Sequence, residues 1–392
     1  MQGCDGIVCY VSNNSFVEQI AFDSMRKHLL HDFTHIFHLD LHGNVRQNTK
    51  LSGTTHNIFG IQVGVGITVA IRSGQHSTRQ LFYHRVPEDW RKGQKLDFLQ
   101  SKVSISGVDW KLLEPDSRQL WIIPKNADMF RDYLEIGSKN TKKARGLDAK
   151  AIFKKYSVGL STNRDAWVYS FNSTQLQEQV KRFIETYNSE IDRWKRAKKP
   201  TNIDAFVTND EAKLKWSSRL KETFAREVYA EFDEAKIRTC LYRPFSRRYV
   251  FFDSILNHRQ SVLPEIFPDL VSEQENRIIA LSSVGNSKSF QALITNMIAD
   301  AHLTSDSQCF PFYAYDSDGT NRRENITDWA LAQFRAQYAD AMISKWDIFY
   351  YVYGLLHHPG YREKFADALK RELPRIPYAP EFKAFAEGVS KG

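Results

Sequence analysis

The stretch GIVCYVSNNSFVEQIAFDSMRKHLLHDFTHIFHLDL, residues 6–41, carries the pattern that decides the fold class. Residues 6–12 are apolar and rich in β-branched side chains, which predicts a buried strand ending in the polar turn of residues 13–15. A helix is predicted over residues 17–33, followed by a short strand over residues 34–41. The residues expected near one face of the helix are Ile20, Met25, Leu29 and Phe33.

Two more apolar, strand-like stretches follow, at residues 58–72 and 79–86, and the turn SGQHST between them predicts a hairpin. A strand, a helix, a strand and a hairpin are typical of the closing half of a mixed, open α/β sheet. The predicted fold class is therefore α/β. The opening half of the sheet, with any nucleotide-binding glycine loop, would precede Met1.

The rest of the chain predicts a connector, an α+β region and a terminal helical segment that packs on it. In the connector, short helices are expected at residues 93–99 and 132–137 and an exposed loop at 138–146. The predicted domain ranges are 1–86, 87–150, 151–324 and 325–392. In the α+β region we expect strands at 158–162 and 166–171, helices at 173–196 and 209–224, and a strand pair at 237–253 with a turn at Pro244.

Composition indicates a folded globular protein, with 42% hydrophobic and 13% aromatic residues among 392. The longest apolar run is too short to span a bilayer, so no membrane partner is expected. The four cysteines are scattered and predict reduced structural thiols, which fits a cytoplasmic location. The sequence contains no HExxH, GxSxG or paired-cysteine signature, so nothing supports a self-contained hydrolase or a zinc site.

The excess of positive charge is concentrated in the middle of the chain. Residues 141–250 hold 24 Lys plus Arg against 14 Asp plus Glu, out of 54 and 46 in the whole sequence, whose net charge is +8. A localised basic surface is typical of contact with a phosphate backbone. A set of solvated helix faces explains the same numbers equally well.

Residues 6–71 closely resemble the later methyltransferase motifs of Type ISP restriction-modification enzymes. The resemblance continues through VGLSTNRDAWVYSF, YRPFSRRYVFFDSILNHR, SQCFPFYAY, ENITDWAL and SKWDIFYYVYGLLHHPGYREKFADALKRELPRIPYAP, and so covers nearly the whole chain. Members of that family join a nuclease, a helicase-like translocase, an adenine methyltransferase and a target-recognition domain in one polypeptide. The resemblance implies the second half of a Rossmann-like methyltransferase sheet followed by an α+β target-recognition domain and C-terminal helices.

The resemblance also implies what this sequence lacks. Family methyltransferases bind S-adenosylmethionine with a glycine-containing loop and hold the flipped adenine with an [NDS]PP[YF] motif, and neither occurs here. No catalytic residue is therefore predicted, and no cofactor is expected on this chain alone. The implied partners are double-stranded DNA and a chain that carries the missing amino-terminal half.

Candidate site residues follow from position within this framework. Asn13 and Asn14 lie where open α/β sheets bind ligands and are candidates for the rim of the base pocket, or simple turn formers. Phe59 matches a segment that stacks on the flipped base, or is a core residue. The candidates for DNA contact are Asn163, Arg164, Asp165, Arg247, Arg248, His258, Arg259, Lys142, Lys143 and Arg145, with Lys195, Arg196, Lys198 and Lys199 as further backbone contacts or solvated charges.

Two functional hypotheses remain open from the sequence. In the first, the chain is the DNA-binding, sequence-recognising portion of a restriction-modification enzyme that methylates adenine when complete. In the second, it is a split or truncated remnant that acts as a protein-interaction module, because half a sheet leaves an open edge and an uncovered apolar face.

Overall fold

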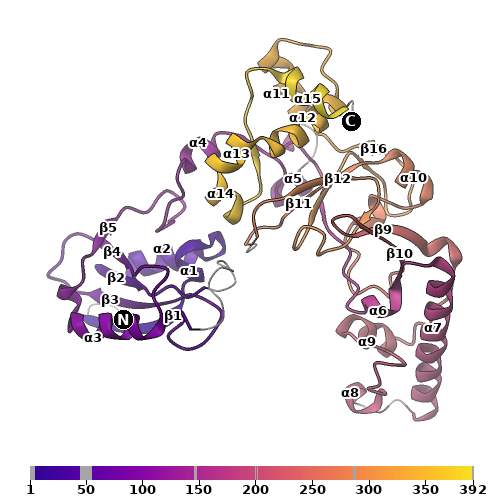
Figure 1. Cartoon of the computed structure of the whole chain (residues 1–392), viewed down its shortest axis with the longest axis horizontal. Coiled ribbons are helices and arrows are strands. Elements are labelled where there is room, and N and C mark those ends of the chain that lie inside the picture. Colours follow the sequence, from indigo (N-terminus) through magenta and orange to yellow (C-terminus); the bar gives the residue numbers. More distant parts are fainter. Residues whose placement is uncertain are drawn as a thin grey trace. The chain divides into compact units, whose positions relative to one another are not determined.

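A computed structural model describes residues 5–44, 55–144, 148–198, 200, 202–285 and 288–390 (Figure 1). They form two compact units. Unit 1 comprises Met1–Phe130, Val284–Ser289 and Lys364–Glu372, and unit 2 comprises Arg131–Ser283, Phe290–Glu363 and Leu373–Gly392. Helices and strands are mixed throughout, so the predicted α/β class is confirmed. The division into four ranges stays a prediction.

Unit 1 is built on a five-stranded sheet in the order β1-β3-β2-β4-β5. Strand β3 is antiparallel to both β1 and β2, whereas β4 is parallel to β2. The strands are β1 (Gly6–Asn13), β2 (His35–Asp40), β3 (Val65–Arg72), β4 (Gln80–Arg85) and β5 (Lys111–Leu113). The helices and 3₁₀ turns are α1 (Ser15–Glu18), η1 (Ile20–Phe22), α2 (Asp23–Asp32), α3 (Lys92–Lys102), η2 (Ile105–Gly107), α4 (Ala127–Arg131) and α14 (Ala366–Arg371).

Strand β2 lies at the centre of this sheet, and both of its faces are buried. Ile36 belongs to an apolar cluster with Phe16 and Trp121, and Leu39 belongs to a second cluster with Val65. Positions three apart in a strand point to opposite faces, so β2 contributes to the core on both sides. Its short, nearly continuous apolar sequence is what such a strand requires.

The predicted hairpin is wrong, because β3 and β4 are not neighbours. Strand β2 lies between them, paired antiparallel with β3 and parallel with β4. The two stretches do form strands, but the first begins only at Val65, so Phe59 lies in a turn rather than in a strand. The prediction failed because central β2 takes both pairings that the hairpin would have used.

Strand β1 forms as predicted but is not buried. It is the edge of the sheet and pairs only with β3 within the described residues. Ile7 is 69% exposed and Val11 is 51% exposed. A sequence rich in β-branched residues specifies a strand, but burial depends on what covers it.

The predicted helix over residues 17–33 is broken at Gln19, whose backbone is extended. Arg26 is fully buried beneath the break and donates hydrogen bonds to the carbonyls of Phe16 (2.6 Å) and Gln19 (2.8 Å). The guanidinium thus satisfies carbonyls that a continuous helix would have bonded itself. Met25, which was predicted on the same helical face as Ile20, is 41% exposed.

Unit 2 contains two four-stranded sheets, in the orders β13-β9-β10-β8 and β12-β11-β14-β7. Their strands are β7 (Ser157–Val158), β8 (Tyr169–Ser170), β9 (Ile237–Arg243), β10 (Ser246–Phe251), β11 (Ile278–Leu281), β12 (Ala292–Thr295), β13 (Ile298–Ala299) and β14 (Gln308–Pro311). Short pairs are formed by β15 (Tyr313–Ala314) with β16 (Arg323–Glu324) and by β6 (Leu134–Glu135) with β17 (Arg375–Ile376).

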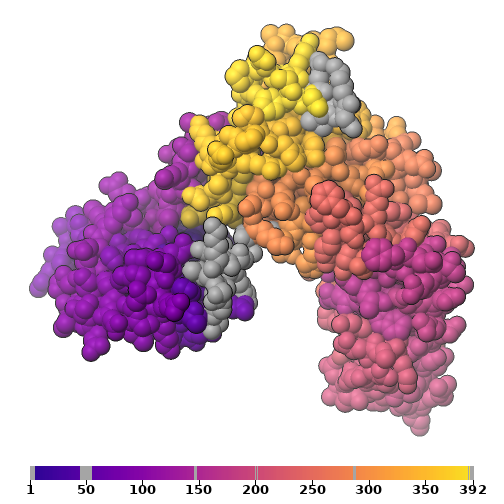
Figure 2. Space-filling view, in the orientation of Figure 1, coloured from indigo at the N-terminus to yellow at the C-terminus, as the bar shows by residue number. Residues whose placement is uncertain are grey.

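The helices of unit 2 precede, interrupt and follow these strands. They are α5 (Lys139–Lys143), α6 (Asp165–Val168), α7 (Ser173–Arg196), α8 (Ile203–Phe206), α9 (Ser218–Ala225), η4 (Glu234–Lys236), η5 (Leu263–Glu265), α10 (Leu270–Glu275), α11 (Asp328–Tyr338), α12 (Lys345–His357), α13 (Pro359–Lys364) and α15 (Phe382–Ser390). The predicted long helix α7, the hairpin β9-β10 and the terminal helical cluster are confirmed. In the space-filling view, the atoms of α7, α8 and α9 lie together in one lobe (Figure 2).

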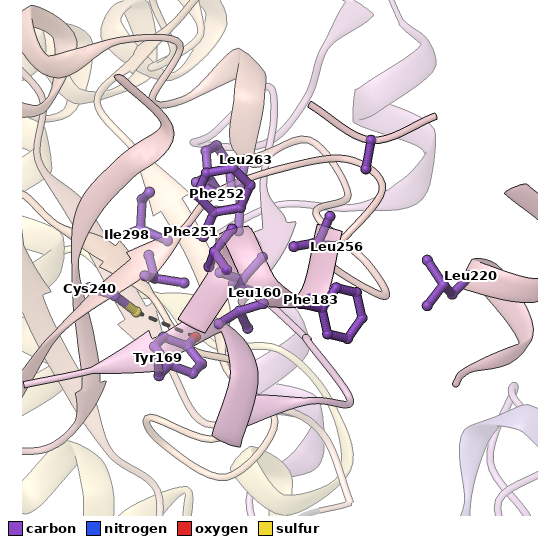
Figure 3. Close-up of a cluster of buried hydrophobic side chains, with 14 of the residues drawn as sticks. Leu160, Tyr169, Phe183, Leu220, Cys240, Phe251, Phe252, Leu256, Leu263 and Ile298 are labelled. Atoms are coloured by element: carbon purple, nitrogen blue, oxygen red, sulfur yellow. Dashed lines mark hydrogen bonds between the residues drawn. The ribbon is translucent and has the colours of Figure 1, made fainter. Parts of the chain in front are cut away.

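The main core of unit 2 lies between α7 and the strands that follow it. Phe183, Tyr169, Cys240 and Phe251 are buried there, and the Tyr169 hydroxyl lies 3.6 Å from the Cys240 sulfur (Figure 3). The apolar face of α7 recurs every three to four residues and packs onto this cluster. The core therefore fixes the strands that carry the polar turns described below.

Four local predictions in this region are wrong. Residues 132–137 contain strand β6 rather than a helix, because Leu134 and Glu135 pair with β17 near the end of the chain. The predicted loop after them contains the short helix α5, capped by the Ser138 side chain. Residues 166–171 contain α6 before β8, and the predicted helix 209–224 is confined to α9, which Ser217 caps.

Among the described residues, no helix has the length and apolar character needed to cross a bilayer.

Candidate nucleic-acid interface

Three polar segments of unit 2 are brought together by specific contacts. They are the turn 161–165, the hairpin tip 242–248 and the corner 257–261. The backbones of Ser161 and Arg259 exchange hydrogen bonds of 3.0 Å and 2.8 Å, which joins the turn to the corner. The Tyr242 hydroxyl donates to Asp165 Oδ2 at 2.8 Å, which joins the turn to the hairpin. We call these three segments the cationic surface.

Arg164 lies beneath this surface rather than on it. Its side chain is 1% exposed, and it donates to the Lys215 carbonyl (3.2 Å), the Ser217 hydroxyl (2.6 Å) and the Leu256 carbonyl. Burial lowers the pKa of the guanidinium to about 10, so it remains charged at neutral pH. Arg164 therefore positions the turn against α9 and the corner, and it is not available to a ligand in this arrangement.

Asn163 and Asp165 flank Arg164 and differ in exposure. Asn163 is exposed and has a left-handed backbone with φ of 56°, a conformation that asparagine tolerates well. Asp165 accepts hydrogen bonds from Thr162 Oγ1 and Tyr242. Asn163 is consequently the side chain of this turn that solvent or a ligand can reach.

The hairpin holds two arginines against the same tyrosine ring. The guanidinium carbons of Arg243 and Arg248 each lie 4.0 Å from the centroid of Tyr242. Arg248 also lies 4.5 Å from the ring of Phe171, which is 70% exposed. Arg243 pairs with Asp300 at 2.7 Å. Stacking on aromatic faces orders guanidinium groups before any ligand binds.

Arg247 differs from Arg248 because it lies on the opposite face of β10. The strand alternates, so Arg247 is exposed while Arg248 is half-buried among aromatic rings. A bulge between β9 and β10 aligns Ser246 with Arg243 but Arg247 with Leu241, leaving Tyr242 as the extra residue. Bulges reorient side chains at functional edges. Here the extra residue is Tyr242, whose ring lies against Arg243 and Arg248.

The tip of the hairpin is Phe245, whose ring is completely exposed. Its relative exposure is 101%, and its backbone φ of 65° lies in the left-handed region. Pro244 precedes it, so the turn places phenylalanine where glycine is preferred. Such a conformation costs a non-glycine residue about 1–3 kcal/mol, and no apolar burial offsets this cost.

The corner forms one wall of an open, polar hollow of about 380 Å³. Its titratable lining residues are Arg219, Glu222, His258 and Arg259. Burial first, and the neighbouring arginines second, lower the pKa of His258, so its imidazole is neutral at pH 7. The arginines thus supply the positive charge of the hollow, and Arg219 on α9 joins the two residues predicted from sequence.

The lysine candidates lie apart from these contacts. Lys142 and Lys143 are exposed on α5. The Lys142 ammonium lies 3.5 Å from the Tyr156 ring centroid, and burial of this ammonium lowers the pKa of Lys142. Lys195 interacts with Tyr229 (3.1 Å) and Glu227 (3.8 Å). Arg196 and Lys198 are exposed near the end of α7. Arg145 and Lys199 lie outside the described residues.

The candidates of unit 1 lie at the carboxyl end of β1 and in the turn before β3. Asn13 is exposed, and its side chain accepts from the Ser15 amide at 3.0 Å. Asn14 points inward, where its amide donates to Asp40 and to the Val65 carbonyl. Phe59 is 57% exposed, so it is not the core residue that the alternative predicted.

The Phe59 turn is organised by Asn57, which is fully buried. The Asn57 amide donates to the carbonyls of Gly43 (3.3 Å) and Val63 (2.6 Å), and its oxygen accepts from the Phe59 backbone at 2.9 Å. These bonds present the Phe59 ring to solvent. The sequence offered one signal for this role, because asparagine commonly organises such turns.

Beside Asn14 lies a buried carboxylate, Asp40, whose hydrogen-bonding capacity is already used. Asp40 accepts from Asn14, from the His42 amide (2.8 Å), from Tyr83 (2.7 Å) and from Arg85 (2.8 Å). Burial opposes ionisation, but His42, Arg85 and these donors hold the pKa of Asp40 below its usual range. A carboxylate so occupied has no free lone pair for a ribose hydroxyl, and no glycine loop follows β1. Asp40 is therefore committed to internal contacts rather than free to bind a ribose.

The fold and the cationic surface define a class, because ordered arginines, exposed aromatics and polar turns on an α+β scaffold are typical of nucleic-acid-binding domains. The sequence also matches the family described as Type ISP C-terminal specificity domain over residues 151–392. The chain belongs to this family. No curated protein sequence gives a significant match.

Solved structures similar to this chain include three complexes with DNA or a DNA substrate mimic. The DrdV–DNA complex is 36% identical with a TM-score of 0.82 over 99% of this chain. A nuclease-deletion mutant of the Type ISP enzyme LlaGI, with a DNA substrate mimic, is 29% identical with a TM-score of 0.80 over 98%. The ATP-dependent Type ISP enzyme LlaBIII bound to DNA is 25% identical with a TM-score of 0.81 over 99%. This chain spans 37%, 35% and 25% of those chains.

The sequence predictions missed several residues of the surface. Arg243 and Tyr242 stand in the same YRPFSRR stretch that predicted Arg247 and Arg248, so the motif itself contained the signal. The sequence contained no signal for Arg219, because this residue is distant in sequence from the corner 257–261 and reaches the hollow only through the packing of α9. The structure brings Asn163, Arg247, Arg248, His258 and Arg259 into one connected set, without Lys142 and Lys143.

Proposed function

We propose that this chain is the DNA-recognising, specificity-determining portion of a Type ISP restriction-modification enzyme. The observation that carries the proposal is the cationic surface, in which the turn, the hairpin and the corner are joined by the Ser161–Arg259 and Asp165–Tyr242 contacts. Family membership and similarity to DNA-bound enzymes support it. Duplex DNA is the expected partner.

Within this proposal the exposed and the held side chains have different roles. Asn163, Arg247 and Arg259 are exposed and are assigned to base edges or phosphates. Arg248 is preorganised between Tyr242 and Phe171 and presents a fixed charge. Lys142 and Lys143 are assigned to the phosphate backbone at most. Arg164 is assigned to positioning.

The test is salt-dependent binding of the whole chain to a fluorescent duplex of random sequence. Removal of Arg247 and Arg259 together should lower the slope of log affinity against log salt by about 1–2, because each lost phosphate contact contributes about 0.9. Lys383→Ala, an exposed charge on α15, serves as the control and should leave the slope unchanged. Folded protein that fails to bind duplex DNA at 50 mM salt would contradict the proposal.

For the complete enzyme we propose site-specific adenine methylation with S-adenosylmethionine bound by segments that this chain does not contain. Asn13, Asn14 and Phe59 would then lie at the rim of the pocket for an extruded adenine. Co-expression with a chain that carries the glycine loop and the [NDS]PP[YF] motif should restore methyl transfer to random-sequence DNA. In that complex, Phe59→Ala should weaken the fluorescence change of 2-aminopurine at the target base, and an unchanged signal would argue against this role.

A second candidate function is complementation through strand β1. Ile7, Cys9 and Val11 alternate along this edge strand and expose one apolar face, and no described strand pairs with the outer edge of β1. A strand from a chain with the missing half fits such an edge. Val11→Lys should abolish co-purification with that chain, whereas Val103→Lys, at a 93% exposed site of unit 1, should not. Equal recovery of both variants would exclude the β1 edge as the contact.

A further inference from the structure

Phe245 has a geometry that the proposed recognition role does not yet explain. It is the second residue of the two-residue turn between β9 and β10, because Arg243 and Ser246 are paired on either side. The ring is fully exposed and the backbone is left-handed. Within the tip, Arg243 on one side and Arg247 and Arg248 on the other flank Pro244 and Phe245 in the sequence.

Among the residues that the structure describes, none covers the Phe245 ring. An open hollow of about 540 Å³ adjoins it, lined by apolar atoms of Leu241, Pro244, Leu293 and Met297, yet the ring remains exposed. Arg247 lines the same hollow, so the exposed guanidinium and the exposed ring lie on one side of the hairpin. Strained backbone and uncovered apolar surface at one residue indicate that its stabilising contacts are made with another molecule.

We propose that Phe245 is a wedge that inserts into the base stack of duplex DNA, and this inference rests on the proposed DNA-recognition function. Apolar side chains inserted between neighbouring base pairs unstack them and bend the duplex. The surrounding arginines select a polyanion over an apolar protein surface, because a protein interface would have to desolvate them. The stacking of Arg248 on Tyr242 and Phe171, and the pairing of Arg243 with Asp300, hold the hairpin tip in a defined orientation.

The experiment is permanganate footprinting of an end-labelled random-sequence duplex with the full chain. Permanganate oxidises thymines that have lost stacking, so it reveals insertion at any position without a known target. Wild-type protein should raise thymine reactivity several-fold at discrete steps. Phe245→Ala should return reactivity to that of free DNA and weaken binding about 5- to 150-fold, the range for loss of one base–aromatic stack.

Two further variants separate insertion from general effects. Phe245→Leu retains an apolar wedge and should keep much of the reactivity, whereas Met342→Ala removes an 86% exposed apolar side chain elsewhere in unit 2 and should keep all of it. The salt slope of Phe245→Ala should match that of the wild type, because no charge is removed.

The outcomes distinguish the two proposals. If the wild type binds DNA with a normal salt slope but leaves thymines unreactive, or if Phe245→Ala retains the reactivity, the wedge is refuted and DNA recognition stands. If the wild type does not bind at low salt, both proposals fail together.

Discussion

Arg164 provides the sharpest test of how the cationic surface is built. Substitution by alanine removes a guanidinium that is 1% exposed and donates to two carbonyls and one hydroxyl from two separate segments, one at Lys215 and Ser217 and the other at Leu256. Hydrogen bonds from a charged donor contribute about 1.5–3 kcal/mol each, and these three share one side chain and are not additive. Together with the cavity left beside Phe183, the expected loss is about 3–5 kcal/mol.

The measurement is urea unfolding monitored by tryptophan fluorescence, because Trp167 packs against the same core. Arg164→Lys keeps the charge but cannot reproduce the fork of bonds, so it should lose about half as much. Arg247→Ala is the matched control: its side chain is exposed, so the free energy of unfolding should change by less than about 0.5 kcal/mol while DNA binding weakens. The reasoning is refuted if Arg164→Ala unfolds within 1 kcal/mol of the wild type and instead loses DNA affinity as Arg247→Ala does.

Two other predictions follow from the backbone of the tip and from a buried imidazole. Phe245→Gly should stabilise the protein by up to about 1 kcal/mol, because glycine accepts a φ of 65° without strain. The control Met342→Gly should destabilise the protein. Thermal unfolding measures both variants, and a loss of stability in Phe245→Gly would contradict the prediction. Burial lowers the pKa of His38 to about 4, so the folded state binds fewer protons than the unfolded state below about pH 6.5. The free energy of unfolding should therefore fall by up to about 3 kcal/mol as pH drops from about 6.5 to 4. His38→Gln should remove this part of the dependence of stability on pH. If the wild type and His38→Gln show the same pH dependence, His38 does not titrate this way.

Local sequence chemistry was sufficient wherever an element depends on its own residues. The long helix predicted at residues 173–196 matches the observed ends of α7, and the turn predicted at Pro244 lies in the β9-β10 hairpin. The stretch YRPFSRR around Pro244 also contains the arginines of the hairpin tip. Propensity and periodicity act over a few neighbouring residues, so a single sequence displays them.

Elements whose partners are distant in sequence were mispredicted. Residues 134 and 135 form β6 because Arg375 and Ile376 pair with them, and without that partner the pattern of residues 132–137 could not be distinguished from a helix. The hairpin of β3 and β4 failed because β2 inserts between them. In each case the deciding interaction is a non-local hydrogen-bond ladder, which propensity does not encode.

The sequence by itself determined the α/β class, the basic middle of the chain and the candidate residues of the YRPFSRR stretch. Only the tertiary structure decided which candidates meet and which are buried. Asn163 and Arg164 are adjacent in sequence, yet packing exposes one and encloses the other. Exposure depends on what the rest of the chain places over a side chain, and that physical quantity exists only once the chain has folded.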